Sequence, residues 1–449
     1  MKLPVLKSKY QLFGELNRKQ IYPFAIIACC FALWGFTNDM TSTMASAFSK
    51  IFRISVSEGG MAVVANHLGY LVMAFPAAWL IMKYRFKAGV MTGLAVYALG
   101  ALLFLPAKTL GVFPPFLLAY FTMTCGLAFL ETCCHPLVYS MGSEESGIGR
   151  LNLVQSFNAL GALVGMFVVR DVIQAGMSPL SSLERSGLPE RQFEIIKDHD
   201  LGVLIQPYVY IVAVIVILLV VIFFYNPKAT INQLSSSRHL WRQVKQVAKA
   251  KNYREGVITQ FFYVGAQVCC WAYILQYGSR IFLAEGMDET TAMMEAQKYN
   301  IIAMAMFAVG RFLCTWLLKY IEAGRLLAVM AIAAVVLTIG IMFFTDRNGL
   351  YCLIMVSFCM SLMFATIYGI SLRNMGRQVK LASAGMTMAV SGGALFPASQ
   401  AAIIDAQISF LGLPATNISF IIPLVCFCVV AVYGHRGYVR HSIASQYYG

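Results

Sequence analysis

The chain has 449 residues, of which 59% are hydrophobic and 12% charged, and its formal net charge is +14. With a strongly positive mean hydropathy as well, this composition excludes a soluble globular domain. The sequence therefore predicts an integral membrane protein.

Long apolar stretches follow one another along the chain. About twenty apolar residues cross a bilayer as a helix, and roughly twelve stretches of that length are present. They run near 21–48, 59–82, 87–106, 113–138, 150–169, 204–225, 254–283, 296–318, 325–344, 350–372, 379–404 and 418–433. The first twenty residues are polar and basic and precede a full-length apolar run without a cleavage pattern, so we expect no removable signal peptide.

Lysine and arginine gather on one side of the membrane. With an even number of spans, both termini and the even-to-odd loops share one side, which carries more than twice as many of these residues as the other. The positive-inside rule then predicts that both termini are cytoplasmic. The basic loop 228–254 has no groove-reading pattern, so we expect no nucleic-acid partner.

The first stretch places an aromatic ring, an amide and an acid within two helical turns, at Trp34, Asn38 and Asp39. This mixture is typical of a sugar site, because hydroxyls need donors and acceptors while the C–H face of the ring stacks on an aromatic side chain. Asp39 is one of two acids inside long apolar stretches, where a charge is costly and is usually functional.

The second such acid is Glu131, four residues before His135 in the fourth stretch. Residues four apart share a helix face, and a buried carboxyl can alternate between neutral and ionised forms as water reaches it. We therefore predict that Glu131, His135 and Asp39 couple transport to protons. The alternative is structural: Glu131 tied to a neighbouring helix through Arg311, and a histidine that is simply hydrogen-bonded.

Polar side chains recur at helical spacing in three later stretches. They are Asn152, Gln155 and Asn158 in the fifth, Gln260, Tyr263, Gln267 and Trp271 in the seventh, and Ser357, Ser361, Phe364 and Tyr368 in the tenth. Any one amide can simply bond between helices, which is the alternative at each position. Because the stripes occur in both parts of the chain, we interpret them as the lining of a shared polar cavity.

Two sequence echoes share one offset. KYRFKAG at 83–89 resembles KYIEAG at 319–324, and PLVYSMG ending at Gly142 resembles GISLRNMG ending at Gly376. A common offset of about 235 residues favours a duplication. We therefore predict twelve transmembrane helices in two pseudo-symmetric halves, 1–225 and 254–449, joined by a basic cytoplasmic linker at 226–253, with the substrate site between them.

The 12 cysteines include adjacent pairs at 29–30, 133–134 and 269–270. Neighbours on a helix point about 100° apart, and no C-x-x-C spacing occurs, so we expect neither a metal site nor disulfides.

These segments together resemble the major facilitator superfamily, and within it the bacterial L-fucose/proton symporter family and its sugar-porter relatives. The matching segments are Leu33-Trp34 with Asn38, Lys87-Ala88-Gly89, Leu130-Glu131-Thr132, the run from Arg150 to Asn158, QFFYVGAQVCCW at 260–271, and Gly310-Arg311-Phe312. The resemblance covers nearly the whole chain.

The resemblance implies import of a monosaccharide, L-fucose or a related hexose, driven by the proton gradient through alternating access. It places the family's proton-coupled glutamate on Glu131. It places the family's cavity residues on Trp34, Asn38, Gln155, Asn158, Tyr263, Gln267 and Trp271. It further implies a bacterial inner (plasma) membrane location, no enzymatic activity and no cofactor. We expect a monomer whose partners are sugar, proton and lipid bilayer.

Three positions depart from the family pattern. The family's helix-one aspartate falls on Ser42, its asparagine after the helix-four motif falls on His135, and its tyrosine-proline step of helix ten falls on Phe364-Ala365. A passive sugar uniporter or a proton-coupled exporter of the same fold is the alternative. A polytopic membrane enzyme is disfavoured because the sequence has no phosphate-binding glycine loop and no metal-ligand spacing, and a non-transporting sugar sensor is the remaining class.

Overall fold

The computed structural model describes residues 18–54, 56–84, 86–180, 182–224, 240–407 and 412–448. The described chain is built from helices, and twelve of its helical segments are long and apolar enough to cross a membrane. The prediction of an all-α fold with twelve spans is confirmed.

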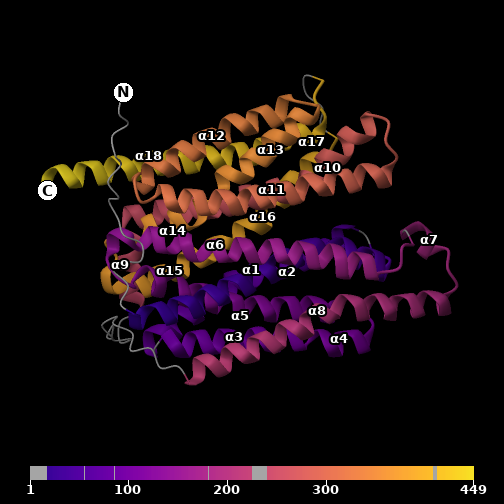
Figure 1. The fold of residues 1–449 in the computed structure, drawn as a ribbon, viewed down its shortest axis with the longest axis horizontal. Helices are drawn as coiled ribbons and strands as arrows, with labels where there is room; N and C mark the ends of the chain where they lie inside the picture. The colour runs from indigo at the N-terminus through magenta and orange to yellow at the C-terminus, as the bar shows by residue number, and fades with distance from the viewer. Residues whose placement is uncertain are drawn as a thin grey trace.

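The helices up to residue 224 form one bundle, the lower one in Figure 1, which we call the N-half. Its helices are α1 Arg18–Phe52, α2 Val56–Lys83, α3 Phe86–Leu102, α4 Phe104–Leu110, α5 Pro114–Tyr139, α6 Glu144–Val168, a π-helical turn Val169–Gln174, α7 Ser182–Ser186 and α8 Glu190–Phe224. The fourth span, α5, is the most enclosed segment of this bundle, with buried residues running almost continuously from Tyr120 to Tyr139.

The helices from residue 251 form the second bundle, the C-half, most of which is drawn above the first in Figure 1; the segment Val379–Met388 instead lies against α2 and α5 of the N-half. They are α10 Lys251–Ala284, α11 Glu289–Leu317, α12 Ala323–Phe343, α13 Arg347–Met360, α14 Met363–Leu372, α15 Val379–Met388, α16 Gly392–Asp405, α17 Ala415–Ile418 and α18 Ile421–Tyr448, with 3-10 turns at Gly376–Gln378 and Ala389–Ser391. Helix α9 Leu240–Lys249 precedes this bundle, so the predicted linker contains a helix of its own.

Several helix starts follow from capping side chains in the sequence. Ser143 accepts a hydrogen bond from the backbone of Ser146 at the start of α6, and Asp288 does the same for Thr291 at the start of α11. A capping oxygen satisfies one of the backbone N–H groups that a helix start leaves free. These caps fix where the two helices that line the interface between the halves begin.

The tenth span is broken into α13 and α14. The break at Ser361 and Leu362 leaves the Met360 carbonyl available, and the Tyr263 hydroxyl donates to it at 2.9 Å. Inside a membrane such a freed carbonyl needs a protein donor, because no lipid group supplies one. One residue of the predicted polar stripe therefore holds the interruption of a neighbouring helix.

Helices α1 and α6 pack backbone against backbone. A Cβ placed on Gly35 would lie 1.9 Å from the Asn158 carbonyl oxygen, and one on Gly161 would lie 1.9 Å from that of Ala32. Only glycine permits such an approach, and small residues are the usual means of close helix contact in membranes. The two helices are therefore joined along the middle of the N-half.

Helix α1 begins and helix α18 ends at the same end of the bundle, which we call the terminal end and which lies at the left of Figure 1. Hydrogen bonds between the halves gather there. The Ser383 hydroxyl donates to the Thr132 carbonyl at 3.0 Å, and the Asn374 backbone N–H donates to Glu144 at 2.7 Å. Deeper in, the Asn152 amide donates to the Thr366 hydroxyl at 3.1 Å. These contacts hold the two bundles together at the terminal end.

The opposite end carries a folded segment between α6 and α8, around α7 (Figure 1). Arg185 and Asp200 form an ion pair at 2.7 Å there, and both side chains are 0% exposed. The second Asp200 oxygen accepts the backbone N–H of Ser178 at 2.9 Å. The helix α8 begins at Glu190, well before the predicted start near 204, because its first turns belong to this segment rather than to an apolar stretch.

Candidate functional site

Glu131 lies in the enclosed part of α5 and is 0% exposed. Neither carboxyl oxygen has a hydrogen-bond partner among the described residues. The hydroxyls of Tyr70 on α2 and Tyr368 on α14 lie close enough to interact electrostatically with this carboxyl. An isolated buried carboxylate is very costly, so this arrangement holds the carboxyl in its neutral, protonated form.

His135 is also fully buried and lies one turn further along α5. Its Nδ1 lies 3.0 Å from the Glu131 backbone carbonyl, and its Nε2 lies 2.8 Å from the Gln155 amide nitrogen. A carbonyl only accepts and an amide nitrogen only donates, so Nδ1 carries the proton and Nε2 accepts. His135 is therefore a neutral imidazole, and it is bonded to the backbone of Glu131 rather than to its carboxyl.

Gln155 connects the two halves. Its side-chain oxygen accepts a hydrogen bond from Arg311 Nη1 at 3.3 Å, while its nitrogen donates to His135. Arg311 lies on α11, is 2% exposed, and stacks on the Phe307 ring at 4.7 Å. No carboxylate within the described ranges forms an ion pair with Arg311. A chain of hydrogen bonds thus runs from Arg311 of the C-half through Gln155 and His135 to the backbone carbonyl of Glu131 on α5.

Aromatic rings enclose the imidazole. Tyr368 stacks on it with centroids 4.5 Å apart, while Phe31 and Trp34 meet its faces and edges at 4.9 and 5.8 Å. The Trp34 indole N–H donates to the Tyr70 hydroxyl at 2.8 Å. Trp34 and His135 therefore lie in one cluster, next to the buried Glu131. The sequence predicted a shared cavity, but not these contacts.

Asn158 forms a hydrogen bond between helices, which was the alternative to its lining a cavity. Its amide nitrogen donates to the Phe31 carbonyl at 3.2 Å, while the side chain is only partly buried. One bond to the backbone of α1 leaves the amide oxygen as a remaining acceptor. The structural and the binding interpretations of this residue are therefore compatible.

The seventh-span stripe divides into bonded and unbonded members. Tyr263 is buried with its hydroxyl on Met360, and Trp271 is half-buried with its indole N–H 3.4 Å from the Ser357 hydroxyl. Gln267 is half-buried. Gln260 is 0% exposed, and neither its oxygen nor its nitrogen has a partner among the described residues. Trp271 also packs against a small contact between the halves, formed by Ala162, Met166 and Met304.

For three α1 residues named in the sequence analysis, the structure describes the backbone but not the side chain. The backbones of Asn38, Asp39 and Ser42 belong to α1, but their side chains fall outside the part of the chain that the structure describes.

The alternative that Arg311 holds Glu131 is wrong in this structure, because Arg311 bonds Gln155 and leaves the carboxyl unpaired. Tyr70 and Phe31 are cluster members that the sequence analysis missed. Both read as ordinary apolar or aromatic helix residues, and nothing in their spacing separates them from lipid-facing rings. Within the described residues, no three His, Cys, Asp or Glu side chains are grouped to hold a metal ion.

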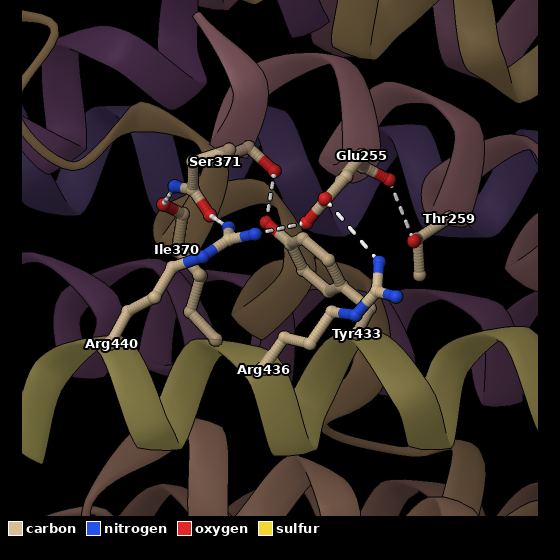
Figure 2. Close-up of polar contacts among 8 residues, drawn as sticks. Glu255, Thr259, Ile370, Ser371, Tyr433, Arg436 and Arg440 are labelled. Atoms are coloured by element: carbon tan, nitrogen blue, oxygen red, sulfur yellow. Dashed lines mark hydrogen bonds and ion pairs between the residues drawn. The ribbon is translucent and has the colours of Figure 1, made fainter.

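A contrasting carboxylate, Glu255, lies at the terminal end of α10. Figure 2 shows it between two arginines of α18: Arg440 Nη2 lies 2.5 Å from one oxygen and Arg436 Nη1 lies 3.4 Å from the other. Arg440 also donates to Asn252 at 2.9 Å, and Asn252 donates to the Ile370 carbonyl at 2.8 Å. We call these four charged and amide residues the Glu255 cluster; it ties α10, α14 and α18 together within the C-half.

Comparison with known proteins agrees with the geometry. Residues 27–397 match the family described as Major Facilitator Superfamily. The L-fucose-proton symporter of Haemophilus influenzae is 41% identical over 94% of this chain and 98% of that protein, and the L-fucose-proton symporter of Escherichia coli is 31% identical over 93% of both. The crystal structure of FucP in the outward conformation matches with a TM-score of 0.82 at 29% identity, covering 94% of this chain and 99% of that chain. The chain belongs to the Major Facilitator Superfamily.

Proposed function

We propose that this protein is a proton-coupled monosaccharide symporter, with L-fucose as the leading substrate. The observation that carries the proposal is Glu131: a fully buried carboxyl inside a membrane span, without a partner among the described residues. Such a group can bind and lose a proton whenever water reaches it, which is what coupling to a proton gradient requires. The names of the two symporters that cover nearly the whole chain support the same function and supply the sugar.

The sugar would bind between the halves, beside the aromatic rings that enclose His135. From the N-half we assign Trp34, Asn38, Gln155 and Asn158, which offer an aromatic face and amide groups for hydroxyls. From the C-half we assign Tyr263, Gln267 and Trp271. The Tyr263 hydroxyl already holds the Met360 carbonyl, so its contribution would be the ring rather than a hydrogen bond.

Protons would enter and leave at Glu131, and we assign Asp39 and His135 to the same proton route. Because the hydrogen bonds described above hold the halves at the terminal end, substrate access in this conformation would come from the opposite end, past the apolar contact of Ala162, Met166 and Met304. The positive-inside rule places the terminal end in the cytoplasm, so the conformation would be outward-facing, in agreement with the outward FucP structure to which it is similar. We expect a monomer in the bacterial inner membrane that needs no cofactor.

The test is the Glu131→Gln variant in proteoliposomes. Glutamine keeps the shape of the neutral acid but cannot release a proton, so uphill accumulation of labelled L-fucose should fall to the equilibrium level. Exchange of sugar across the membrane at equal concentrations should persist. Thermal stability should be unchanged, because no hydrogen bond of the carboxyl is lost.

Glu255→Gln is the matched control, because it removes a carboxylate that has fixed arginine partners. Accumulation should survive in that variant. Concentrative uptake that persists in Glu131→Gln would contradict the proposal. Sugar entry into wild-type vesicles without alkalinisation of the external medium would indicate a uniporter or an exporter instead.

A further inference from the structure

Arg311 is the buried cation that links the C-half to His135 through Gln155, and it has no role in the function proposed above. Its guanidinium lies on the Phe307 ring, and one of its nitrogens donates to the Gln155 oxygen. Its Nε has no partner among the described residues. A buried arginine held by a single amide, at the contact between α6 and α11, calls for a functional explanation.

The Gln155 amide is directional. With Arg311 donating to its oxygen, the amide must turn its NH2 group toward His135. The reverse orientation would set the amide N–H against the guanidinium N–H and leave both donors unpaired. Arg311 therefore decides which end of the amide the histidine meets.

The histidine tautomer follows from that direction. His135 Nε2 faces an amide donor and must accept, while Nδ1 faces the Glu131 carbonyl and must donate. Protonation would place a second N–H on Nε2, directly against the amide N–H. Among the side chains that the structure describes, the other titratable groups near the imidazole are Glu131, one helical turn before it on α5, whose carboxyl is uncharged when protonated, and the Tyr368 phenol of α14. Trp34 and Phe31 of α1 carry no charge.

We propose that Arg311 is a positioning residue for proton coupling: by orienting the Gln155 amide, it keeps His135 neutral for as long as α6 and α11 remain in contact. When the halves separate at this point, the amide is free to turn and present its oxygen to Nε2. A protonated His135 would then have two acceptors, the Gln155 oxygen and the Glu131 carbonyl. A proton released by the Glu131 carboxyl could then be taken up by this imidazole, giving a carboxylate and an imidazolium one helical turn apart on α5.

This inference deepens the proposed function and rests on it for its meaning in transport, but the tautomer can be measured without sugar or gradient. The experiment is nitrogen-15 NMR of histidine-labelled protein in lipid vesicles, with the His135→Asn variant identifying the His135 signal. In the wild-type protein the signal should be that of neutral imidazole protonated on Nδ1. It should not change over about pH 5 to 8, the range in which an unperturbed histidine changes charge.

The Arg311→Met variant removes the charge and keeps much of the apolar volume. Its His135 signal should convert to imidazolium toward the acid end of that range, from none in the wild type to most of the population. Arg280→Met is the matched control, because it removes an arginine from another C-half span without touching Gln155, and its His135 signal should match the wild type.

Three outcomes would overturn the proposal. A wild-type His135 that is protonated on Nε2, or charged at neutral pH, would contradict the proposal even if Arg311→Met failed to fold. The proposal would also be wrong if Arg311→Met folds, as judged by gel filtration, and its His135 gives the wild-type signal. The same conversion in Arg280→Met would show that Arg311 has no specific role. If the tautomer is as expected and transport proves uncoupled from protons, only the proposed function fails.

Discussion

Two carboxylates on membrane helices, Glu131 and Glu255, differ in what surrounds them. Glu255 lies between Arg436 and Arg440 at the terminal end of the C-half, and its charge is compensated by groups of its own bundle. Glu131 lies deep in the N-half with no partner among the described residues. A carboxylate with fixed cations gains nothing from taking a proton, whereas one without them breaks no ion pair when it is protonated and ionises only when water reaches it. The difference separates an acid that holds helices together from one suited to exchange protons.

Asp200 offers the largest test of this contrast, because it is fully paired and fully buried. Asp200→Asn should lower the free energy of unfolding of the segment around α7 by about 3 to 5 kcal/mol, since it leaves Arg185 charged and without its counterion. Limited proteolysis between residues 177 and 200 should accelerate accordingly. Asp198→Asn, which breaks a pair between the largely exposed Asp198 and the partly exposed Lys108, is the control and should have little effect. Equal proteolysis rates in the two variants would contradict the contrast.

Glu255→Gln should have an intermediate effect. Arg436 is largely exposed and Arg440 partly so, and solvent screening limits the loss of stability to about 1 kcal/mol. Thermal unfolding in detergent measures this loss, with the exposed Glu145→Gln variant as reference. Accumulation of sugar should be retained. If Glu255→Gln lost accumulation as completely as Glu131→Gln, the proposed division of roles between the two acids would be wrong.

Glu285 should show the smallest effect. Hydrogen bonds from Arg347 lower the pKa of this exposed carboxyl below its ordinary value of 4.5. A lowered folded-state pKa means that the carboxylate stabilises the protein above pH 4.5 and that this contribution is lost as the pH falls through the lower folded-state value. Arg347→Gln should remove this part of the pH dependence of the unfolding temperature. Added salt should weaken it in the wild type, and an identical acid profile in wild type and variant would exclude the effect.

Much of the fold was predictable from the sequence because apolar length is a direct physical requirement of the bilayer. The twelve spans follow from this requirement. The structure differs from the prediction where contacts other than apolar burial set the helix ends. Helix α8 begins at Glu190 because its first turns pack around the Arg185 and Asp200 pair, which no apolar pattern encodes. The break between α13 and α14 has no proline or glycine to announce it.

The candidate site was predictable in its types of residue but not in its connections. Helical spacing places Glu131 and His135 on one face, and a charge inside an apolar run marks Glu131 as unusual. Spacing within one helix says nothing of which neighbour lies opposite. That Arg311 meets Gln155 instead of Glu131 depends on how α11 packs against α6, a contact between segments far apart in the chain. The roles of the individual sugar-contacting residues remain predictions.

The glycine contact between α1 and α6 has a consequence for how a ligand is recognised. Because Gly35 and Gly161 let the two backbones approach closely, Trp34 and Asn158 belong to one rigid helix pair. If the N-half moves as a rigid body, α1 and α6 move together, and the distance between the Trp34 indole and the Asn158 amide stays constant. A change in sugar preference would then require different side chains on these helices, because the close backbone contact leaves their spacing no room to adjust.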